Sequence, residues 1–516
     1  MHGSGNRTGA AVSVALLGAT ICGIGCNLIA GIESGVLVDA SPDRRGTSTR
    51  EGGTDATAAG DGSTGADATI HGDGGKSDAG TDAAQQTYAC SPPTNIVQLL
   101  SLGDAGLSAG QKNFSTPYVV SGPFGDPVIV TQLNASSSRF IVFEVTGSNG
   151  LASVQVQALA AQGGLQLYDV QNQGNDPTKP VEVLTSYTVV DGSTNNGGGS
   201  ALQIVTMPSA RYGNNSSLSD ATIDVNVQGL ARSASNTYSA AAFVDLPTGA
   251  GRRIGYLAAE RGAQSNGNAV TLAFGIGPDG GESTVHASDG GTQGGNSMFS
   301  MFFASGTTMY DVTTPSVVPT DGGVDGDGVV IATSDTLGGT GVRGLVYPPT
   351  LPKTGISGLF FAHASTLHPG SVLLFGLEAV VATGTYSTLM GTVPVTKLGG
   401  LVVGDPAYFN KTPLSSIPFT GNSGSAWNGN DELVIAGGDS QKVGLIWIAP
   451  DGHKISLTSF PGQGGNVTGA GVSFSSSVST TFNVAWTEEY GPENSPSEYE
   501  VLYFATLACD TPIDGG

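Results

Sequence analysis

The sequence predicts an all-β protein in which residues 88–511 form a β-propeller of six to eight blades, seven being favoured. Charged residues make up 12% of the 516-residue chain, against a usual share of about a quarter, and glycine occurs 80 times. Short apolar segments alternate with polar residues at a period of two, which is typical of half-buried strands. Such segments recur at spacings of roughly 40 to 75 residues, near the period of propeller blades with their loops. Tandem β-sandwiches would show similar strands and turns and are the alternative.

Residues 1–25 have the order of a secretory signal peptide. Arg7 precedes a long uncharged apolar run, and small residues lead up to Cys26. The segment Gly-Ile-Gly-Cys at 23–26 resembles the lipobox of bacterial lipoproteins, although leucine is usual where Gly23 stands. This resemblance implies cleavage before Cys26 and a lipid on that cysteine, which would anchor the protein in the bacterial cell envelope. An uncleaved membrane anchor over residues 8–32 and a conventional signal peptide that releases a soluble product are the alternatives.

Residues 26–87 are expected to form a disordered tether behind the lipidated N-terminus. Between residues 41 and 86 the chain consists mainly of Gly, Ala, Ser, Thr and Asp, and Ile70 is its one large apolar residue. Such a segment buries too little apolar surface to offset the entropy of ordering it. Its recurring aspartates repel one another and favour an extended chain.

The charge of the chain excludes some partners. Its 42 acidic and 19 basic residues give a formal net charge of −23. A surface with so few lysines and arginines neutralises few phosphates, which argues against nucleic-acid binding. It also argues against adhesion to anionic lipid by charge alone. Contact with a lipid bilayer is therefore expected only through the acyl anchor.

The four cysteines predict one disulfide. If Cys22 leaves with the signal peptide and Cys26 is acylated, Cys90 and Cys509 remain in an oxidising compartment. A bond between them would close nearly the whole folded region, leaving 512–516 as a short tail. A free, buried pair of thiols is the alternative.

Strands and turns account for most of the region after Tyr88. In the segment 481–487, Phe482, Val484 and Trp486 alternate with polar or small residues, which predicts a half-buried strand. The continuous apolar runs 140–143, 359–362 and 433–436 predict strands covered on both faces.

The sequence also predicts one hairpin turn and contains two weak helical signals. Pro450-Asp451-Gly452-His453 predicts a hairpin turn between two strands, because proline presets the turn and glycine accepts a positive φ. The weak helical signals are limited to Ile96–Leu102 and Ile254–Arg261.

Apolar strands and turns repeat loosely along the domain. The expected units begin near Phe140, Val181, Ser239, Met298, Leu359, Glu432 and Thr481. With the Pro-Asp-Gly turns and the segment 481–489 (Thr-Phe-Asn-Val-Ala-Trp-Thr-Glu-Glu), these strands make residues 88–511 resemble the β-propellers of uncharacterised bacterial cell-envelope lipoproteins. A propeller brings its first and last strands together, and a Cys90–Cys509 bond would lock that closure.

No catalytic constellation stands out. His363 and His368 flank a predicted strand end, but the segment 421–425 (Gly-Asn-Ser-Gly-Ser) departs from a nucleophile elbow at its last position, so His363 is read as a polar residue at a strand edge. Glu488 and Glu489 are adjacent and point to opposite faces of a strand, so they cannot flank one glycosidic bond, and a solvated loop start is expected there.

One segment has the composition of a cation site. Asp325 and Asp327 could bind Ca²⁺ through carboxylate oxygens, but the segment lacks the later acidic ligand of an EF-type loop. An acidic surface turn is therefore favoured, and no cofactor other than this candidate Ca²⁺ is expected.

The sequence thus favours a lipid-anchored, non-enzymatic envelope protein that presents its propeller loops to a protein or glycan partner. An exported carbohydrate-active enzyme with its site in the propeller cavity is the first alternative. A purely structural envelope component is the second.

Overall fold

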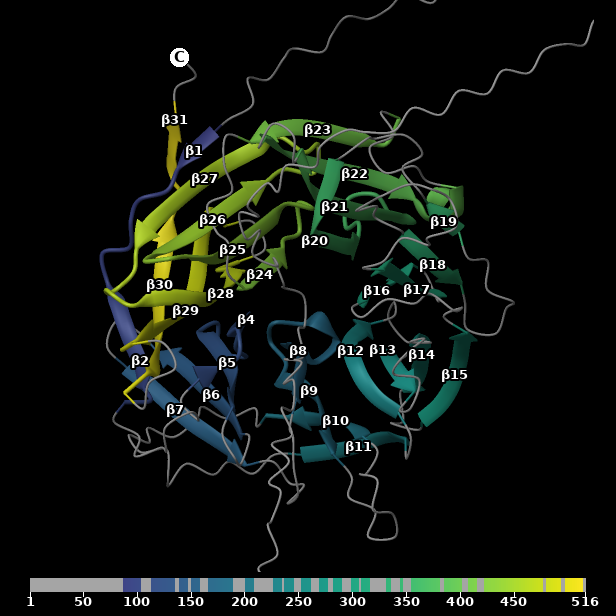
Figure 1. Ribbon diagram of the computed structural model, residues 1–516, viewed down its shortest axis with the longest axis horizontal. Helices are drawn as coiled ribbons and strands as arrows, with labels where there is room; N and C mark the ends of the chain where they lie inside the picture. Colours follow the sequence, from purple (N-terminus) through teal and green to yellow (C-terminus); the bar gives the residue numbers. More distant parts are fainter. Residues whose placement is uncertain are drawn as a thin grey trace, which may run out of the picture. The chain divides into compact units, whose positions relative to one another are not determined.

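The computed structural model describes most of the chain from residue 87 to residue 513 (Figure 1). The described ranges are 87–103, 113–134, 139–146, 150–157, 166–188, 200–207, 226–233, 236–245, 252–260, 269–276, 282–289, 298–305, 308–315, 331–335, 344–346, 354–380, 385–400, 407–414, 422–476, 479–492 and 497–513. The signal peptide, nearly all of the tether, Cys26, Asp325 and Asp327 lie outside these ranges.

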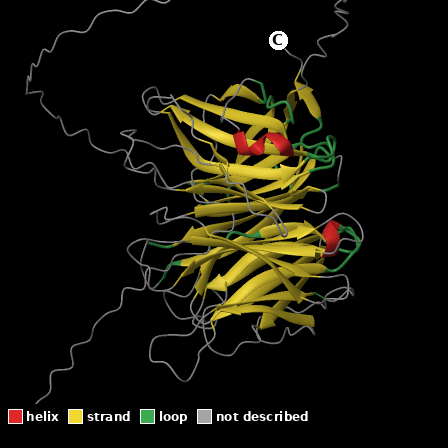
Figure 2. Cartoon of the chain, turned by 90° about the vertical axis from the view of Figure 1, so that its right-hand side faces the viewer, coloured by secondary structure: helices red, strands yellow, loops and turns green. Residues whose placement is uncertain are grey.

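The predicted all-β class is confirmed. Within the described ranges, the helical segments are two 3₁₀ turns, η1 (Gln173–Asn175) and η2 (Val395–Gly400), drawn in red in Figure 2. Neither turn, nor any other described segment, is a helix with the length and apolarity needed to cross a bilayer.

Five sheets are each built from consecutive strands of the chain that pair antiparallel. The first contains β3 (Asn113–Phe114), β4 (Tyr118–Ser121), β5 (Pro127–Asn134), β6 (Arg139–Thr146) and β7 (Gly150–Gln157), with β3 and β4 both pairing with β5. The second contains β8 (Gln166–Asn172), β9 (Val181–Thr188), β10 (Ser200–Thr206) and β11 (Asn226–Ser233).

The next three sheets follow the same rule. The third contains β12 (Asn236–Asp245), β13 (Arg252–Glu260), β14 (Ala269–Ile276) and β15 (Glu282–Asp289). The fourth contains β16 (Met298–Ser305), β17 (Thr308–Pro315), β18 (Ile331–Asp335) and β19 (Gly344–Val346). The fifth contains β20 (Thr354–Ala364), β21 (Ser371–Val380), β22 (Thr385–Pro394) and β23 (Phe409–Leu414).

The remaining large sheet has eight strands in two halves. One half contains β24 (Asn422–Trp427), β25 (Leu433–Asp439), β26 (Lys442–Ile448) and β27 (Lys454–Pro461). The other contains β28 (Asn466–Phe474), β29 (Thr481–Tyr490), β30 (Tyr499–Ala508) and the N-terminal β2 (Ile96–Ser101). The halves meet where β24 and β28 pair in parallel over two residues each.

The two ends of the described chain are joined in three ways. Strand β2 pairs antiparallel with β30. Strand β1 (Thr87–Ala89) pairs antiparallel with β31 (Thr511–Ile513) in a separate two-stranded ribbon. Between these ladders, Cys90 and Cys509 form the disulfide that their position in the sequence suggested, across a separation of 419 residues.

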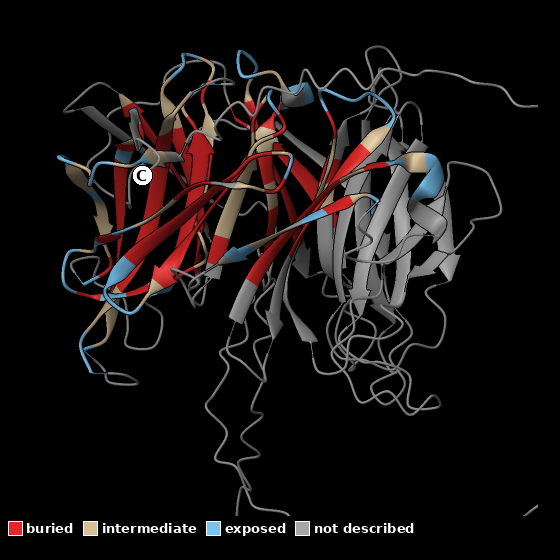
Figure 3. Ribbon diagram, turned by 90° about the horizontal axis from the view of Figure 1, so that it is seen from above, coloured by how far each residue is buried: buried red, intermediate tan, exposed pale blue. Residues whose placement is uncertain are grey.

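The apolar runs 140–143 and 433–436 are buried on both faces of their strands, as predicted, and Figure 3 shows buried residues in red. In the run 359–362, Phe361 is buried and Ala362 is half-buried, while the side chains of Leu359 and Phe360 lie outside the described residues. In β6, Phe140 and Val142 pack against the second sheet, while Ile141 and Phe143 pack against β29 and β30. In the run 433–436, alternate residues enter two different cores in the same way. Each strand is continuously apolar because it has a neighbour on either side.

The prediction of a half-buried strand at 481–487 is wrong. Phe482, Val484 and Trp486 lie in the core between the two halves of the eight-stranded sheet, whereas Ala485 faces the first sheet. The intervening Asn483 is also buried. Alternation of polar and apolar residues therefore does not mark a solvent-facing side here, because a second sheet covers it.

The two weak helical signals are also wrong. Residues 96–101 form β2, and residues 252–260 form β13, which pairs with β12 and β14. Pairing with partner strands overrides local propensity in both segments.

Three of the seven predicted units begin in the first strand of a sheet, and the other four begin at a later strand. Ser239, Met298 and Leu359 lie in strands that open their sheets, whereas Phe140, Val181 and Thr481 lie in later strands. Glu432 directly precedes β25, the second strand of its half-sheet.

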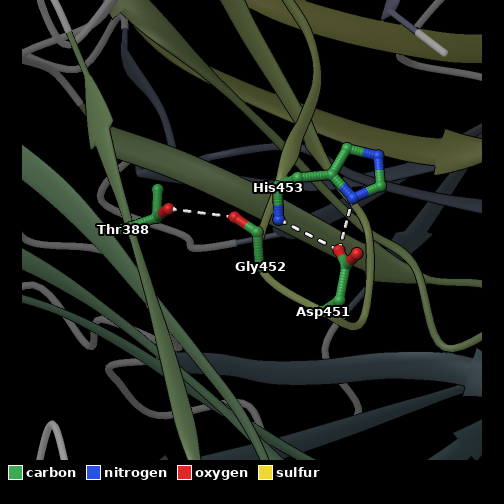
Figure 4. A network of polar contacts seen from close by, with 4 residues as sticks. All are labelled: Thr388, Asp451, Gly452 and His453. Atoms are coloured by element: carbon green, nitrogen blue, oxygen red, sulfur yellow. Dashed lines mark hydrogen bonds and ion pairs between the residues drawn. The ribbon is translucent and has the colours of Figure 1, made fainter. Parts of the chain in front are cut away.

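The predicted turn 450–453 is confirmed (Figure 4). Gly452 has a φ of 87° and its N–H donates to the carbonyl of Ala449 at 2.8 Å. The Asp451 carboxylate accepts from the backbone N–H of His453 at 3.1 Å and also contacts its imidazole. The hydroxyl of Thr388 in β22 donates to the Gly452 carbonyl at 3.3 Å, so the turn also links two sheets.

Polar side chains connect neighbouring sheets. The Gln132 side chain accepts from the backbone N–H of Leu167 at 2.8 Å, and Asp169 accepts from Phe243 N–H at 2.9 Å. These bonds satisfy backbone groups that the sheet ladders leave unpaired. In sequence order, β4 lies against β8, β8 against β12, β12 against β16, and β16 against β20, while β4 also lies against β28.

Candidate functional site

The loop between β20 and β21, residues 365–370, is held by a buried carboxylate from another sheet. Asp431, with 1% of its surface exposed, accepts from the Ser365 hydroxyl at 2.5 Å. It also accepts from the backbone N–H groups of Thr366 at 2.7 Å and Leu367 at 3.1 Å. Three donors on successive residues thus converge on one side chain, which fixes the direction in which the loop leaves β20.

Bonds within the loop fix the rest of it. The Ser365 hydroxyl accepts from the N–H of His368 at 2.9 Å, and the N–H of Ser371 donates to the His368 carbonyl at 3.0 Å. Gly370 takes a φ of 82°, which allows the chain to turn back into β21. Its carbonyl accepts from Val395 N–H at 3.0 Å. The loop is therefore preorganised at both ends.

The turn that carries Asp431 is itself closed by an asparagine. The Asn428 side-chain oxygen accepts from the N–H groups of Asn430 and Glu432, each at 2.9 Å. Its amide nitrogen donates to the Glu432 carboxylate at 2.6 Å. Asp431 adopts a φ of 60°, a conformation that aspartate tolerates better than most residues. The local sequence Asn-Gly-Asn-Asp thus forms a turn that positions one carboxylate.

This loop presents an apolar side chain to solvent. Residues 366–370 are all exposed, and Leu367 has 51% of its surface exposed. Among the large apolar side chains of the described part of the chain, Phe124 in the turn between β4 and β5 is comparably exposed, at 46%. Leu367 thus presents an apolar side chain to solvent from a loop whose backbone is fixed by hydrogen bonds.

His363 lies at the base of the loop, one residue before the end of β20. Its Nδ1 bonds to the carbonyl oxygen of Ala364 at 2.7 Å, and its ring stacks on Trp427 with centroids 5.6 Å apart. Burial lowers the pKa of His363, outweighing the Ala364 carbonyl and the Asp431 charge, both of which raise it. The imidazole is therefore neutral at pH 7, with Nδ1 as its protonated nitrogen.

The contacts of His363 do not match those of a catalytic base. A nucleophile–histidine pair needs a hydrogen bond from the nucleophile to the ring. The nearby Ser365 hydroxyl donates to Asp431 instead, and the protonated Nδ1 of His363 is engaged by its own strand. His368, the other histidine singled out in the sequence, lies exposed at the tip of the same loop.

The expectation of a solvated loop start at Glu488 is wrong. Its side chain has 0% of its surface exposed and accepts four hydrogen bonds. The donors are the backbone N–H of Gln463 (2.6 Å) and Gly465 (2.9 Å), the Trp486 indole (2.7 Å) and the Tyr490 hydroxyl (2.8 Å). All of its acceptor positions are thus in use, so Glu488 holds the 462–465 segment on β29.

Tyr490 continues this network towards β30. Its hydroxyl lies 2.9 Å from the hydroxyl of Tyr503. Burial, followed by the contacts with Tyr503 and Glu488, raises the pKa of Tyr490, and burial raises that of Tyr503. Both phenols therefore stay protonated at neutral pH and serve as hydrogen-bond donors.

Glu500, in β30, links the eight-stranded sheet to the first sheet. Its carboxylate accepts from the backbone N–H of Phe114 in β3 and from the Thr468 hydroxyl at 3.0 Å. Burial raises the pKa of Glu500 to about 7, with Glu489 and Glu498 adding repulsion, although both hydrogen bonds favour the charged form. This carboxyl group therefore changes charge near neutral pH.

Asp431 and Glu500 gave no recognisable signal in the sequence, because their partners come from distant strands. The described residues contain no group of three or more His, Cys, Asp or Glu side chains arranged to hold a metal ion. The candidate Ca²⁺ ligands Asp325 and Asp327 lie outside the described ranges.

No protein-family model matches the chain, and no curated protein matches it either. Among solved structures, prolyl oligopeptidase B from Galerina marginata aligns with a TM-score of 0.40 and 11% identity, over 80% of this chain and 53% of that one. A protein of unknown function from Dyadobacter fermentans aligns at 0.39 and 9%, over 81% and 99% of the two chains. The NanB sialidase from Streptococcus pneumoniae aligns at 0.37 and 8%, over 82% and 71%. The chain spans about half the length of the oligopeptidase, and likeness at this level assigns it neither a family nor an activity.

Proposed function

We propose that the chain is a lipid-anchored, seven-bladed β-propeller that binds a protein partner in the bacterial cell envelope. The seven blades are the five sheets of consecutive strands and the two halves of the eight-stranded sheet. The order of strands within each sheet supports this division, because a propeller blade is a four-stranded antiparallel meander.

Closure of the propeller is supported by the apolar cores between neighbouring sheets. β28–β30 share a core with the first sheet, and the first sheet shares one with the second. β24–β27 share a core with the fifth sheet and another with β28–β30. Two or three β-sandwiches in series would not need a first sheet packed against the last one, so the propeller is favoured.

The observation that carries the binding role is the loop 365–370, which is rigid and exposes Leu367. A catalytic role would require side chains free to act on a substrate, whereas the buried Asp431 and Glu488 are committed to backbone and side-chain donors within the protein. The acidic character of the chain favours a partner that is neutral or basic at the contact.

The partner contact is tested by Leu367→Ser. We expect this variant to lose most of the binding to solubilised envelope proteins of the source cells, because a large exposed apolar side chain is removed from a preorganised loop. Pull-down followed by mass spectrometry gives the measurement. Phe124→Ser is the matched control, since it removes a similarly exposed apolar side chain from another turn. Equal retention of the same proteins by the wild type and both variants would contradict this role for the loop.

The anchor is tested by the intact mass of protein extracted from membranes. We expect a chain that starts at Cys26 and carries additional mass matching an acylated cysteine. Cys26→Ser should abolish that modification and shift the protein into the soluble fraction. A wild-type chain that keeps residues 1–25, or that starts elsewhere without added mass, would refute the anchor.

A further inference from the structure

The N-terminal strand has the fewest buried residues among the described residues of the sheet that it completes. None of the residues of β2 (Ile96–Ser101) is fully buried, whereas its partner β30 is buried along most of its length. Strand β2 is therefore held mainly by its backbone ladder with β30 and by partial packing of a few apolar side chains. Leu102, directly after the strand, is the first fully buried residue of this segment.

Any pull on the N-terminal tether reaches the folded domain first at β1 and then, along the chain, at β2. The chain enters at Thr87, and β1 pairs antiparallel with β31 over three residues. A force on that end separates such a ladder one residue pair at a time, and each hydrogen bond contributes only about 1 kcal/mol net. Without an obstacle, the separation would continue from β1 into β2, which belongs to the same run of chain.

The disulfide lies between the β1–β31 ladder and the β2–β30 ladder. Cys90 follows β1 directly, and Cys509 follows β30 directly. Cys509 is fully buried in the core of the eight-stranded sheet, and its N–H donates to the Thr480 carbonyl at 2.9 Å. On the other side, the N–H of Ser91 donates to the Ala508 carbonyl at 2.9 Å. A load that arrives at Cys90 is therefore passed to a strand fixed inside the core.

We propose that the Cys90–Cys509 bond is a mechanical stop, which diverts tension on the tether into β30 before it reaches β2. This role rests on the proposed function, because an anchored protein bound to a partner is loaded between its N-terminus and its binding loop. The bond then keeps the closing strand in place while the tether is pulled. A disulfide placed only to lower the entropy of the unfolded chain would not need to lie between the tether and the closing strand.

The test is a single-molecule pulling experiment on the full chain. One handle is attached at the N-terminus and the other at a non-natural amino acid replacing the exposed His368, so that the load follows the proposed path. With the bond intact, we expect only the tether and β1 to extend before the whole domain unfolds. In the double variant Cys90→Ser with Cys509→Ser, β2 should detach first, at a several-fold lower force. That event should add about 40 Å of extension, as a dozen released residues provide at roughly 3.5 Å each.

The matched control is Ser456→Ala, which removes the hydroxyl 3.2 Å from the Cys90 sulfur and leaves the bond in place. It should behave like the wild type. If the double variant does not fold, the same step is sought in wild-type molecules before and after reduction in the trap. Identical forces and step sizes with and without the bond would overturn the proposal. Because no lipid is involved, this outcome is independent of the mass measurement that tests the anchor.

Discussion

Replacing Glu488 by leucine is expected to destabilise the domain by more than about 4 kcal/mol. The substitution deletes the acceptor of four hydrogen bonds in a fully buried position. Each donor left without a partner costs about 1 to 3 kcal/mol, and entering water can recover only part of that loss. The measurement is urea unfolding, in which the midpoint should fall while the slope stays constant.

Two other variants distinguish the loss of these hydrogen bonds from the loss of the Glu488 charge and from the loss of a charge at the neighbouring position. Glu488→Gln keeps one acceptor oxygen but places an amide NH₂ against the remaining donors, so we expect an intermediate loss of about 1 to 3 kcal/mol. Glu489→Gln removes the neighbouring half-buried charge without removing an acceptor from the four donors of Glu488, so it should cost less than either Glu488 variant. A Glu488→Leu protein within about 1 kcal/mol of the wild type would show that the network is not needed.

Apart from the disulfide, the features that the sequence predicted correctly are decided by residues close together in the chain. The turn at 450–453 follows from proline, aspartate and glycine within four positions. The strands at 140–143 and 433–436 follow from continuous apolar runs. The placement of the two cysteines beyond the tether suggested the pairing of Cys90 with Cys509 without any knowledge of the strands between them.

The features that were missed depend on partners far away in the sequence. Asp431 binds residue 366 across 65 positions, and Glu500 binds residue 114 across 386. The residues of β2 carry a weak helical signal, and the partner strand that makes them a strand lies at the other end of the chain. Glu488 is expected to be solvated because charged residues are rarely buried, and two of the four donors that offset its burial come from the separate segment 462–465. No local pattern encodes such contacts.

Glu500 is expected to make the stability of the domain depend on pH. Burial raises its pKa from 4.5 to about 7 in the folded protein. Between these values the folded state binds more protons than the unfolded state, so the contribution to stability is full at low pH and is lost as the pH rises through about 7. A shift of this size corresponds to about 3 kcal/mol lost between about pH 4 and pH 8.

The variant Glu500→Gln should remove this dependence while keeping an acceptor for the Phe114 N–H. Urea unfolding at several pH values is compared between the wild type and the variant, since repulsion among the other carboxylates affects both alike. The difference in stability between them should shift by about 3 kcal/mol in favour of the variant as the pH rises. Glu498→Gln removes a half-buried carboxylate that repels Glu500 and should retain most of the pH slope. Parallel pH profiles for the wild type and Glu500→Gln would mean that Glu500 does not titrate in this range, and that the first sheet and β30 are joined by an ordinary charged hydrogen bond.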